Sequence, residues 1–303
     1  MADILTLLYL LITLYTSDIN APETVLVQKV FTEIQQNGVE ATVERLENDL
    51  PSVFAEAGIE LPIEIPVKNS ESQAIEPETL DYEKELKKLG HFKDESKDKN
   101  LNLRNAILRF QSSCNLKADG ILGDVTLEAL SFQLSTEGSL CTDMIDSPPS
   151  AGKWLVINKS TRILTLYEND KILKKYPIAI GNPPSLTPNG KFTIVSKVVN
   201  PAWGGGGYAR PVKGGIPANP LGYRWMGLSY KGGDDLGVHG NNSPYSIGKN
   251  ISHGCIRMIN SDVEELFETV PRSASVWIGD EAVLKEWGVQ QKTYISTADE
   301  ENI

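Results

Sequence analysis

The spacing of apolar residues changes along the chain at Ser135–Lys153, a stretch rich in Ser, Thr and Pro. Before it, apolar residues recur at intervals typical of an amphipathic helix: Leu103, Ala106, Ile107 and Phe110. After it, Trp154–Gly181 alternates apolar and polar residues around a turn-like Glu168–Asp170, which is typical of a β-hairpin. The two periods predict two domains with separate cores, a small helical one followed by a mainly β one.

The length of 303 residues agrees with several domains, because a domain typically has about 100–150 residues. Residues 61–78 are rich in Pro, Ser and Glu and lack an apolar period, which indicates a linker. We therefore expect a multidomain chain with six parts: a helical N-terminal region at 1–60, a linker at 61–78, a small three-helix domain at 79–134, a second linker at 135–152, a mainly β domain at 153–280 and a C-terminal tail at 281–303.

An apolar run from Ile4 to Tyr15 lies near the start of the chain. It is shorter than the roughly 20 residues that cross a bilayer, so we expect no integral membrane span. Its length suits a signal peptide, but no Lys or Arg precedes it, and Pro22 follows the small-residue cleavage candidate Ala21. A signal peptide and a buried helix both remain open.

The acidic composition excludes some classes of partner. Lys and Arg number 29 against 40 Asp and Glu, which gives a formal net charge of -11. Binding to nucleic acid or to anionic lipid needs a basic patch, so we expect neither. The three cysteines form no CxxC pair, which argues against a common structural zinc site. Cys114 and Cys141 either pair in an oxidising compartment or both stay reduced and buried.

A glycine-rich turn lies in the helical domain, within LKADGILGDVTLEAL. Gly120 and Gly123 allow backbone angles with positive φ, and Asp124 is placed to cap a last helix through Leu130. With an earlier apolar period that begins at Tyr82, this pattern predicts three helices.

Residues 80–133 resemble the peptidoglycan-binding domain, whose signature is FQ, a short spacer and ADGxxG before a helix. The matching residues are Phe110-Gln111 and Ala118–Gly123. Members commonly carry another DGxxG-like turn between the first two helices, where this chain has HFKDESKDKN. The resemblance implies binding to peptidoglycan, and the departure leaves a purely structural spacer as the alternative.

One helix is expected late in the β domain, from about Asp262 to Val270. Ser261–Glu264 matches a capping box, so Ser261 is the predicted N-cap. Short strands between Gly, Pro and Asn turns make up the rest of this domain.

Two of the three histidines and one of the three cysteines lie within Val238–Met258. If Ser252–Met258 is extended, its side chains alternate between two faces, and the apolar set faces the core. The residues on the accessible face are then His253, Cys255 and Arg257. One excursion of the chain after His239 brings the strand back beside it.

These residue types suit acyl transfer by a thiol. A neighbouring imidazole can take the proton of Cys255, whose unperturbed pKa is roughly 8.5, and hold the thiolate as an ion pair. Backbone N–H groups of Gly254 and Cys255 would stabilise the oxyanion. Two other interpretations remain open: a zinc site of His239, His253 and Cys255, for which no fourth ligand lies nearby, and a structural cluster.

ISHGCIRM, preceded by VHGNNSPYSIG, resembles the catalytic motif of the L,D-transpeptidases of the YkuD-like family. Supporting matches are Thr187–Phe192, similar to the family's TPxGxF, and Pro217 with Asn219–Gly222, similar to PxNPLG. The resemblance implies a nucleophile, a general base, an orienting residue and two backbone donors: Cys255, His239, His253, and Gly254 with Cys255. Arg257 either holds a substrate carboxylate or pairs with a structural acid.

The resemblance further implies a two-step acyl transfer on peptidoglycan stem peptides. Cys255 attacks the third residue, releases the terminal D-alanine, and an amine of another stem completes a 3→3 cross-link. Resolution by water would instead make the protein an L,D-carboxypeptidase, and a wall-binding protein with an inactive catalytic domain is the other alternative. The expected partners are peptidoglycan stem peptides and glycan, at an extracytoplasmic site in the cell wall or periplasm. We expect a monomer that needs no metal and no organic cofactor.

Further substrate contacts are expected from Ser252 and from the glycine-rich stretch Trp203–Tyr208. Trp203 and Tyr208 would supply aromatic contacts if this stretch is a mobile lid, and a flexible connection without a role is the alternative. No GK[ST] sequence follows, which argues against a phosphate-binding loop.

Overall fold

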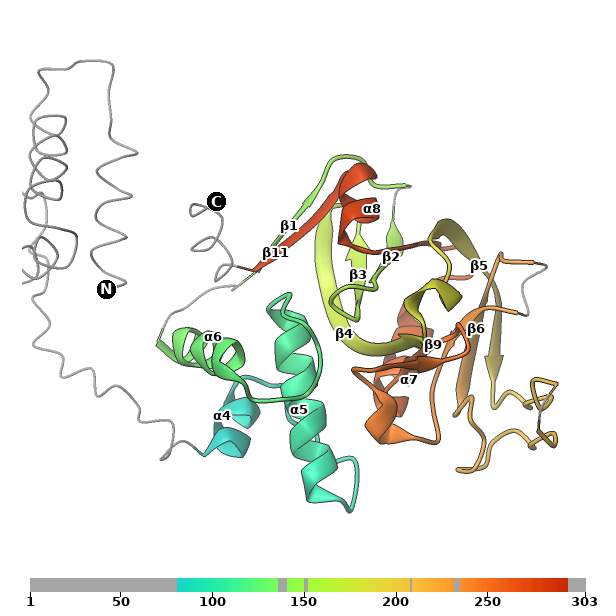
Figure 1. Cartoon of the computed structure of the whole chain (residues 1–303), viewed down its shortest axis with the longest axis horizontal. Coiled ribbons are helices and arrows are strands. Elements are labelled where there is room, and N and C mark those ends of the chain that lie inside the picture. The colour runs from blue at the N-terminus through green and yellow to red at the C-terminus, as the bar shows by residue number, and fades with distance from the viewer. Residues whose placement is uncertain (1–80, 136–140, 150–151, 208, 232–234, 294–303) are drawn as a thin grey trace, which may run out of the picture. The chain divides into compact units, whose positions relative to one another are not determined.

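The computed structural model describes residues 81–135, 141–149, 152–207, 209–231 and 235–293. All of these residues belong to one compact unit, which contains both the helices and the sheet (Figure 1). The expected helical region at 1–60 and the linker at 61–78 lie outside the described residues, as does Tyr208.

Three helices lie between residues 81 and 135: α4 (Tyr82–Lys88), α5 (Lys99–Ser113) and α6 (Asp124–Ser135). A side chain caps each of the first two, because Asp81 accepts the N–H of Lys84 and Asp98 accepts that of Leu101. Apolar residues at helical spacing meet in one core that includes Leu86, Phe110 and Leu130. The helical period seen in the sequence therefore builds a small core of its own.

The start of α6 differs from the prediction by one residue. The helix begins at Asp124 itself, and the Leu127 N–H donates to the Gly123 carbonyl at 3.0 Å. Gly123 therefore takes the position expected for Asp124. The carboxylate lies in the first turn, where a negative charge is favourable.

Nine strands form the main sheet: β2 (Lys153–Asn158), β3 (Ile163–Glu168), β4 (Lys171–Gly181), β5 (Gly190–Val199), β6 (Arg224–Leu228), β7 (Gly237–His239), β8 (Asn250–Ser252), β9 (Ile256–Met258) and β10 (Ser275–Gly279). Their order is β3-β2-β10-β5-β6-β7-β9-β4-β8, and β3 also pairs with β4, so the sheet closes on itself. The mainly β expectation and the hairpin at Glu168–Asp170 are confirmed.

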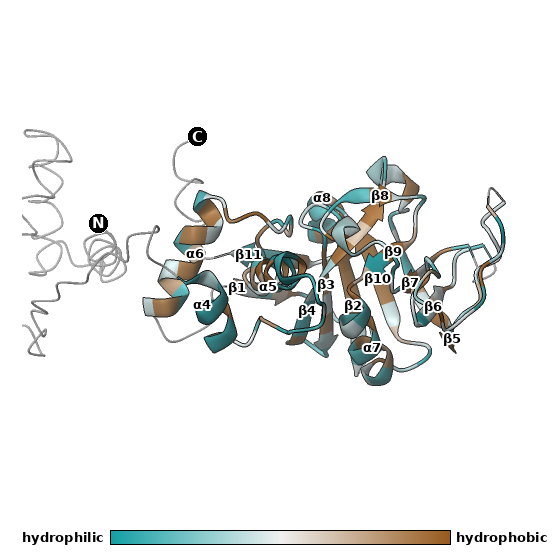
Figure 2. Cartoon of the chain, turned by 90° about the horizontal axis from the view of Figure 1, so that it is seen from below, coloured by the Kyte–Doolittle hydropathy of each residue, from teal (hydrophilic) through white to brown (hydrophobic). Residues whose placement is uncertain are grey.

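The strands are more fully buried than simple alternation suggests. All six residues of β2 except Lys153 are buried, because the closed sheet is covered on both faces there. Apolar side chains from most strands meet in one core, which includes Leu155, Ile178, Met226, Ile256 and Val276. Figure 2 shows strips of hydrophobic residues along the strands and on α6.

The predicted linker and tail both contain regular structure. The stretch at 135–152 contains β1 (Cys141–Ile145), and the stretch at 281–303 contains α8 (Glu281–Glu286) and β11 (Val289–Thr293). β1 pairs with β11 along its whole length in antiparallel register. The polar composition of these stretches led to the prediction of a linker and a tail. The two strands are polar because they bury only part of their side chains.

The late helix, α7 (Asn260–Thr269), lies where the sequence predicts it, but Ser261 does not cap it. Ile259 occupies the N-cap position and offers no side-chain hydrogen bond. The Ser261 hydroxyl donates instead to Glu95 of the helical domain. The capping box is therefore a wrong prediction, because a tertiary contact takes up the Ser261 hydroxyl.

The helical domain packs directly on the closed sheet. Leu108 and Ala118 share a buried cluster with Ile163 and Ile247 of the β domain. The Ala118 N–H donates to the Thr161 carbonyl at 2.8 Å, so the ADGxxG turn is joined to the turn between β2 and β3. The two domains thus share an interface.

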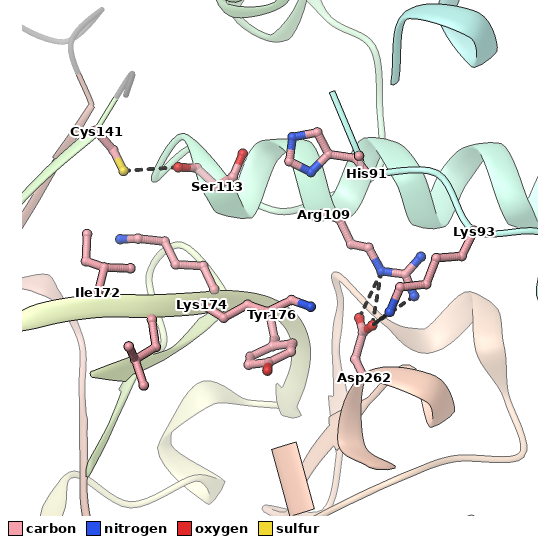
Figure 3. Close-up of a pocket in the computed structure, with 12 residues that line it drawn as sticks. His91, Lys93, Arg109, Ser113, Cys141, Ile172, Lys174, Tyr176 and Asp262 are labelled. Atoms are coloured by element: carbon pink, nitrogen blue, oxygen red, sulfur yellow. Dashed lines mark hydrogen bonds and ion pairs between the residues drawn. The ribbon is translucent and has the colours of Figure 1, made fainter. Parts of the chain in front are cut away.

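A buried ion pair joins α5 to α7 at this interface. Nε and Nη2 of Arg109 donate to Asp262 at 3.1 and 2.9 Å, and Nη2 also reaches Glu95. Figure 3 shows Arg109 and Asp262 facing each other beside His91 and Lys93. These residues line a cavity of about 410 Å³ between the helices and β4, and neither the thiol of the candidate site nor its histidines line it.

Candidate active site

Two neighbouring strands bring the predicted residues together. β7 and β9 run parallel, and their register pairs His239 with Arg257. Cys255 comes directly before β9, so it lies two residues along the chain from Arg257, the partner of His239. The predicted return of the chain beside His239 is therefore confirmed.

The segment Ser252–Met258 is not one continuous strand. β8 ends at Ser252 and β9 begins at Ile256, with a turn between them. The expected alternation of faces holds nonetheless. His253 is exposed and two residues are half-buried, namely Cys255 and Arg257, whereas the intervening Gly254, Ile256 and Met258 are buried.

The turn requires glycine at position 254. Gly254 has a φ of +133°, and a Cβ there would lie 2.7 Å from the Leu186 carbonyl oxygen. The fully buried Thr187 donates its hydroxyl to the Gly254 carbonyl at 2.6 Å and accepts the Gly181 N–H at 2.9 Å. These contacts fix the backbone just before Cys255.

Ser252 organises the same turn from the other side. Its hydroxyl accepts the Gly254 N–H at 3.1 Å and donates to the Cys255 carbonyl at 2.6 Å. The side chain is buried, so its position favours bracing of the turn over the expected contact with substrate. Because the Gly254 N–H is engaged inside the protein, Gly254 is also a poor oxyanion donor.

Cys255 is held mainly as a neutral thiol. Burial raises its pKa, and the nearby Asp235 acts in the same direction. The Gly237 N–H and the Arg257 guanidinium oppose this shift without reversing it. The Asp235 carbonyl lies 3.9 Å from Sγ.

His239 has the opposite shift. Burial lowers its pKa to about 4, with a contribution from the Arg257 charge and against the effect of the Gly240 carbonyl. Nδ1 lies 2.7 Å from that carbonyl oxygen, which can only accept, so Nδ1 carries the proton and Nε2 carries the free lone pair. The ring also stacks on Trp225, at 5.6 Å between centroids.

The pKa shifts therefore favour a neutral thiol at Cys255 and a neutral imidazole at His239. This differs from the expected thiolate and imidazolium ion pair, and the physical reason is burial, which penalises both charges. A neutral imidazole with a free Nε2 can still accept a proton during attack by sulfur.

Several supporting residues have no signal of their own in the sequence. Thr187 lies in the TPxGxF match, but its contact with Gly254 depends on tertiary structure. Asn260 is another, since its side chain accepts the Asn241 N–H at 2.8 Å and donates to the Asn241 carbonyl at 3.0 Å. Asn260 thereby fixes the chain just after His239.

Trp203 is the predicted substrate contact in the glycine-rich stretch. Trp203 forms a backbone bridge with Val212 at the ends of the glycine-rich loop, with N–H to O distances of 2.9 and 2.8 Å. The structure assigns neither a lid motion nor a substrate contact to Trp203, so these stay predictions. Cys114 and Cys141 are not joined by a disulfide in the structure, and Cys141 Sγ donates to the Ser113 carbonyl at 3.0 Å.

Within the described ranges, no group of three or more His, Cys, Asp and Glu side chains is arranged to hold a metal ion. The zinc interpretation therefore gains no support from these residues. None of the helices described here is long and apolar enough to cross a membrane.

Comparison with known proteins separates the same two domains. A family model described as the L,D-transpeptidase catalytic domain, YkuD, matches residues 152–278. A second, described as a peptidoglycan binding domain, matches residues 76–130.

Similar proteins carry related names. The chain is 36% identical over 157 residues to the protein named L,D-transpeptidase YqjB of Bacillus subtilis (strain 168), which covers 51% of this chain and 87% of YqjB. It is 35% identical over 150 residues to the protein named L,D-transpeptidase YkuD of the same strain, which covers 50% of this chain and 80% of YkuD. Among solved structures, an L,D-transpeptidase from Xylanimonas cellulosilytica DSM 15894 aligns with a TM-score of 0.46 and 22% identity, over 67% of this chain and 94% of that chain.

Proposed function

The chain belongs to the L,D-transpeptidase family, and we propose that it forms 3→3 cross-links in peptidoglycan by acyl transfer through Cys255. The observation that supports this most directly is the parallel pairing of β7 with β9, because the strand that ends at His239 then runs beside the strand that directly follows the half-buried Cys255. The substrate is peptidoglycan, so the proposed place of action is extracytoplasmic, in the cell wall or periplasm.

In the first step Cys255 Sγ attacks the carbonyl carbon of the third stem residue. His239 Nε2 takes the thiol proton as the S–C bond forms and gives it to the departing amine of D-alanine. We assign oxyanion stabilisation to the backbone N–H of Cys255, because Ser252 already accepts the N–H of Gly254. The product of this step is a thioester.

In the second step the side-chain amine of another stem attacks the thioester. His239 Nε2 accepts a proton from this amine and returns it to the sulfur, which leaves as the thiol. Arg257 is half-buried on β9, and we propose that its guanidinium holds a stem carboxylate near the thiol. His253 is exposed beside the turn and is proposed to orient the incoming group.

The test uses a defined tetrapeptide muropeptide and the masses of its products. Transfer predicts a dimer whose mass equals two stems minus one D-alanine, and Cys255→Ala should give none. Monomeric tripeptide as the only product would show an L,D-carboxypeptidase instead. Unchanged substrate with folded wild-type protein would support an inactive wall-binding protein.

We also propose that the helical domain binds the wall. The ADGxxG turn has one side joined to the β domain at Ala118, but Ile121 and Val125 next to it are 65% and 55% exposed. Co-sedimentation with purified sacculi should therefore fall in an Ile121→Ser/Val125→Ser variant relative to the wild type. Equal pelleting of the two proteins would favour a structural spacer.

A further inference from the structure

The loop that joins the two reacting groups is held by the helical domain. This loop, residues 240–249, leaves β7 after His239 and leads into β8, which ends at the turn that carries Cys255. Its middle part contains a short helix, η3 (Pro244–Ser246), which lies next to α5 through the contacts given below. A displacement of this loop would therefore move one reacting group relative to the other.

Arg104 of α5 makes the central contact. Its Nη2 donates to the Ile247 carbonyl at 2.7 Å and to the Asp119 carbonyl at 3.0 Å. One guanidinium nitrogen thus links the loop to the ADGxxG turn. The side chain lies flat against Gly120, where a Cβ would meet its atoms at 3.0 to 3.1 Å, so glycine at this position leaves room for it.

Tyr245 makes a second contact with the start of α5. Its hydroxyl donates to Asp98 Oδ2 at 2.7 Å, while Oδ1 of the same carboxylate caps the helix through the Leu101 N–H. The Arg104 guanidinium lies 6.0 Å from the Tyr245 ring. The helix start and the loop are therefore tied through one carboxylate.

Gly248 closes the contact with the turn. It has a φ of +83°, and a Cβ there would lie 2.9 Å from the Ala118 carbonyl oxygen. Its N–H donates to the Ile178 carbonyl of β4 at 3.0 Å. The loop is therefore fixed between the helical domain on one side and the closed sheet on the other.

We propose that Arg104 and Tyr245 are positioning residues for the reaction, so that the helical domain forms part of the catalytic unit as well as a contact with the wall. This inference rests on the proposed roles of Cys255 and His239. Misplacement of reacting groups by about 1 Å costs roughly 100-fold in rate, so contacts remote from the chemistry can limit it. The buried interface cluster at Leu108 and Ala118 supplies the rigidity that such positioning needs.

The test compares Arg104→Met, Arg104→Lys and Tyr245→Phe in the full chain with the control Lys99→Met. Lys99 is an exposed cation at the start of the same helix. We expect Arg104→Met to lower kcat on a soluble tetrapeptide stem by roughly 10–100-fold with KM unchanged. Arg104→Lys should recover most of this loss, because one ammonium can reach both carbonyls, and Lys99→Met should match the wild type.

The second readout is alkylation of Cys255 by iodoacetamide as a function of pH, followed by intact mass. The midpoint of the profile should move in Arg104→Met and in Tyr245→Phe, because the thiol no longer has the same approach to His239. Tyr245 is 45% exposed, so Tyr245→Phe keeps the test valid if Arg104→Met fails to fold. A normal kcat and an unchanged alkylation profile in both variants would overturn the proposal, as would a rise in KM alone.

Failure of this inference and failure of the proposed function give different results. If the wild type forms no cross-link while the alkylation profile still depends on Arg104, the positioning role stands and the transpeptidase proposal fails. If the wild type forms dimers and every variant matches it, the function stands and the positioning role fails.

Discussion

Burial acts in opposite directions on the two groups proposed to react. It lowers the pKa of His239 to about 4 and raises that of Cys255, so both are neutral near pH 7. The proton of the thiol must then move as the sulfur attacks. A base that works in this way needs only its lone pair, which is present at every pH well above 4.

The pH profile of the reaction should show this shift. We predict that kcat/KM for a tetrapeptide stem stays constant down to about pH 5 and falls as the pH decreases through about 4, because protonation of His239 removes its acceptor. Initial rates are measured between about pH 4 and 8, with circular dichroism to restrict the comparison to folded protein. An acid limb near 6.5, the value of an ordinary histidine, would contradict the structure.

Substitution of the two groups should separate their roles. Cys255→Ala should abolish turnover and any covalent adduct with a carbapenem, since the acyl group has lost its carrier. His239→Ala should slow acylation by roughly 10²–10⁴-fold, the usual scale for a positioned base. Intact-mass spectrometry follows both, with Cys141→Ala as the control that should still form the adduct. Unchanged acylation in His239→Ala would transfer the role of base to His253.

Local sequence could predict which residues gather at the site but not what each backbone group does. Extended geometry predicts alternation along Ser252–Met258, and the alternation of burial is found although a turn interrupts the two strands. The bond from Gly254 to Ser252 depends on a turn with positive φ, for which the sequence offers only the presence of a glycine. The pKa shift of His239 depends on burial by distant strands, which no local pattern contains.

At the scale of elements, the first turn of α7 is used for tertiary contacts. Asn260 holds the chain after His239, Ser261 donates to Glu95, and Asp262 accepts from Arg109. The sequence predicts a capping box because Ser261 and Glu264 have the spacing of that motif. Helix start signals predict that a helix begins here, but not whether their side chains stay local.

The ion pair of Arg109 and Asp262 should contribute strongly to stability. Their side chains are 7% and 1% exposed, so Asp262→Asn leaves a buried guanidinium short of its main partner. We predict a loss of about 3 kcal/mol in the free energy of unfolding, measured by urea denaturation.

The matched control is Glu83→Gln, which breaks the exposed pair with Lys87 on α4. This change should cost less than about 0.5 kcal/mol, because water screens the pair. Similar losses of unfolding free energy in the two variants would show that the buried pair stabilises the protein no more than the exposed one.

At the scale of the whole molecule, the sequence predicts the two domains but not how they pack against each other. Periodicity predicts the helical and mainly β parts because each has its own core. The interface depends on pairs far apart in the chain, such as Leu108 with Ile247, and a single sequence carries no signal for such pairs. The sequence predicts two domains joined by a linker, and in the structure these two domains also pack against each other.

Acid should destabilise the whole unit before most carboxylates titrate. Burial lowers the pKa of both His91 and His239 from 6.5 to about 4, so the unfolded chain binds more protons than the folded one between these values. Stability is therefore complete above about pH 6.5 and decreases as the pH falls toward 4. For the buried His239 the loss reaches roughly 3 kcal/mol, or about 5–10 °C in Tm.

Thermal melts at about pH 7, 6, 5 and 4 measure this effect. The decrease in Tm should be shallower in His91→Gln than in the wild type, whereas His253→Gln, a change at an exposed side chain, should follow the wild type. Parallel curves for all three proteins would contradict the assignment.

The pairing of β1 with β11 has a consequence for the order in which the molecule is completed. Cys141 of β1 pairs with Thr293 of β11. β1 therefore pairs with a strand that is synthesised only after the whole nine-stranded sheet. A ribosome that adds about 5–20 residues per second needs roughly 7–30 s to travel from one strand to the other. During that interval β1 has no partner strand and presents its open edge to any protease or chaperone it meets, and the arrival of β11 ends that exposure.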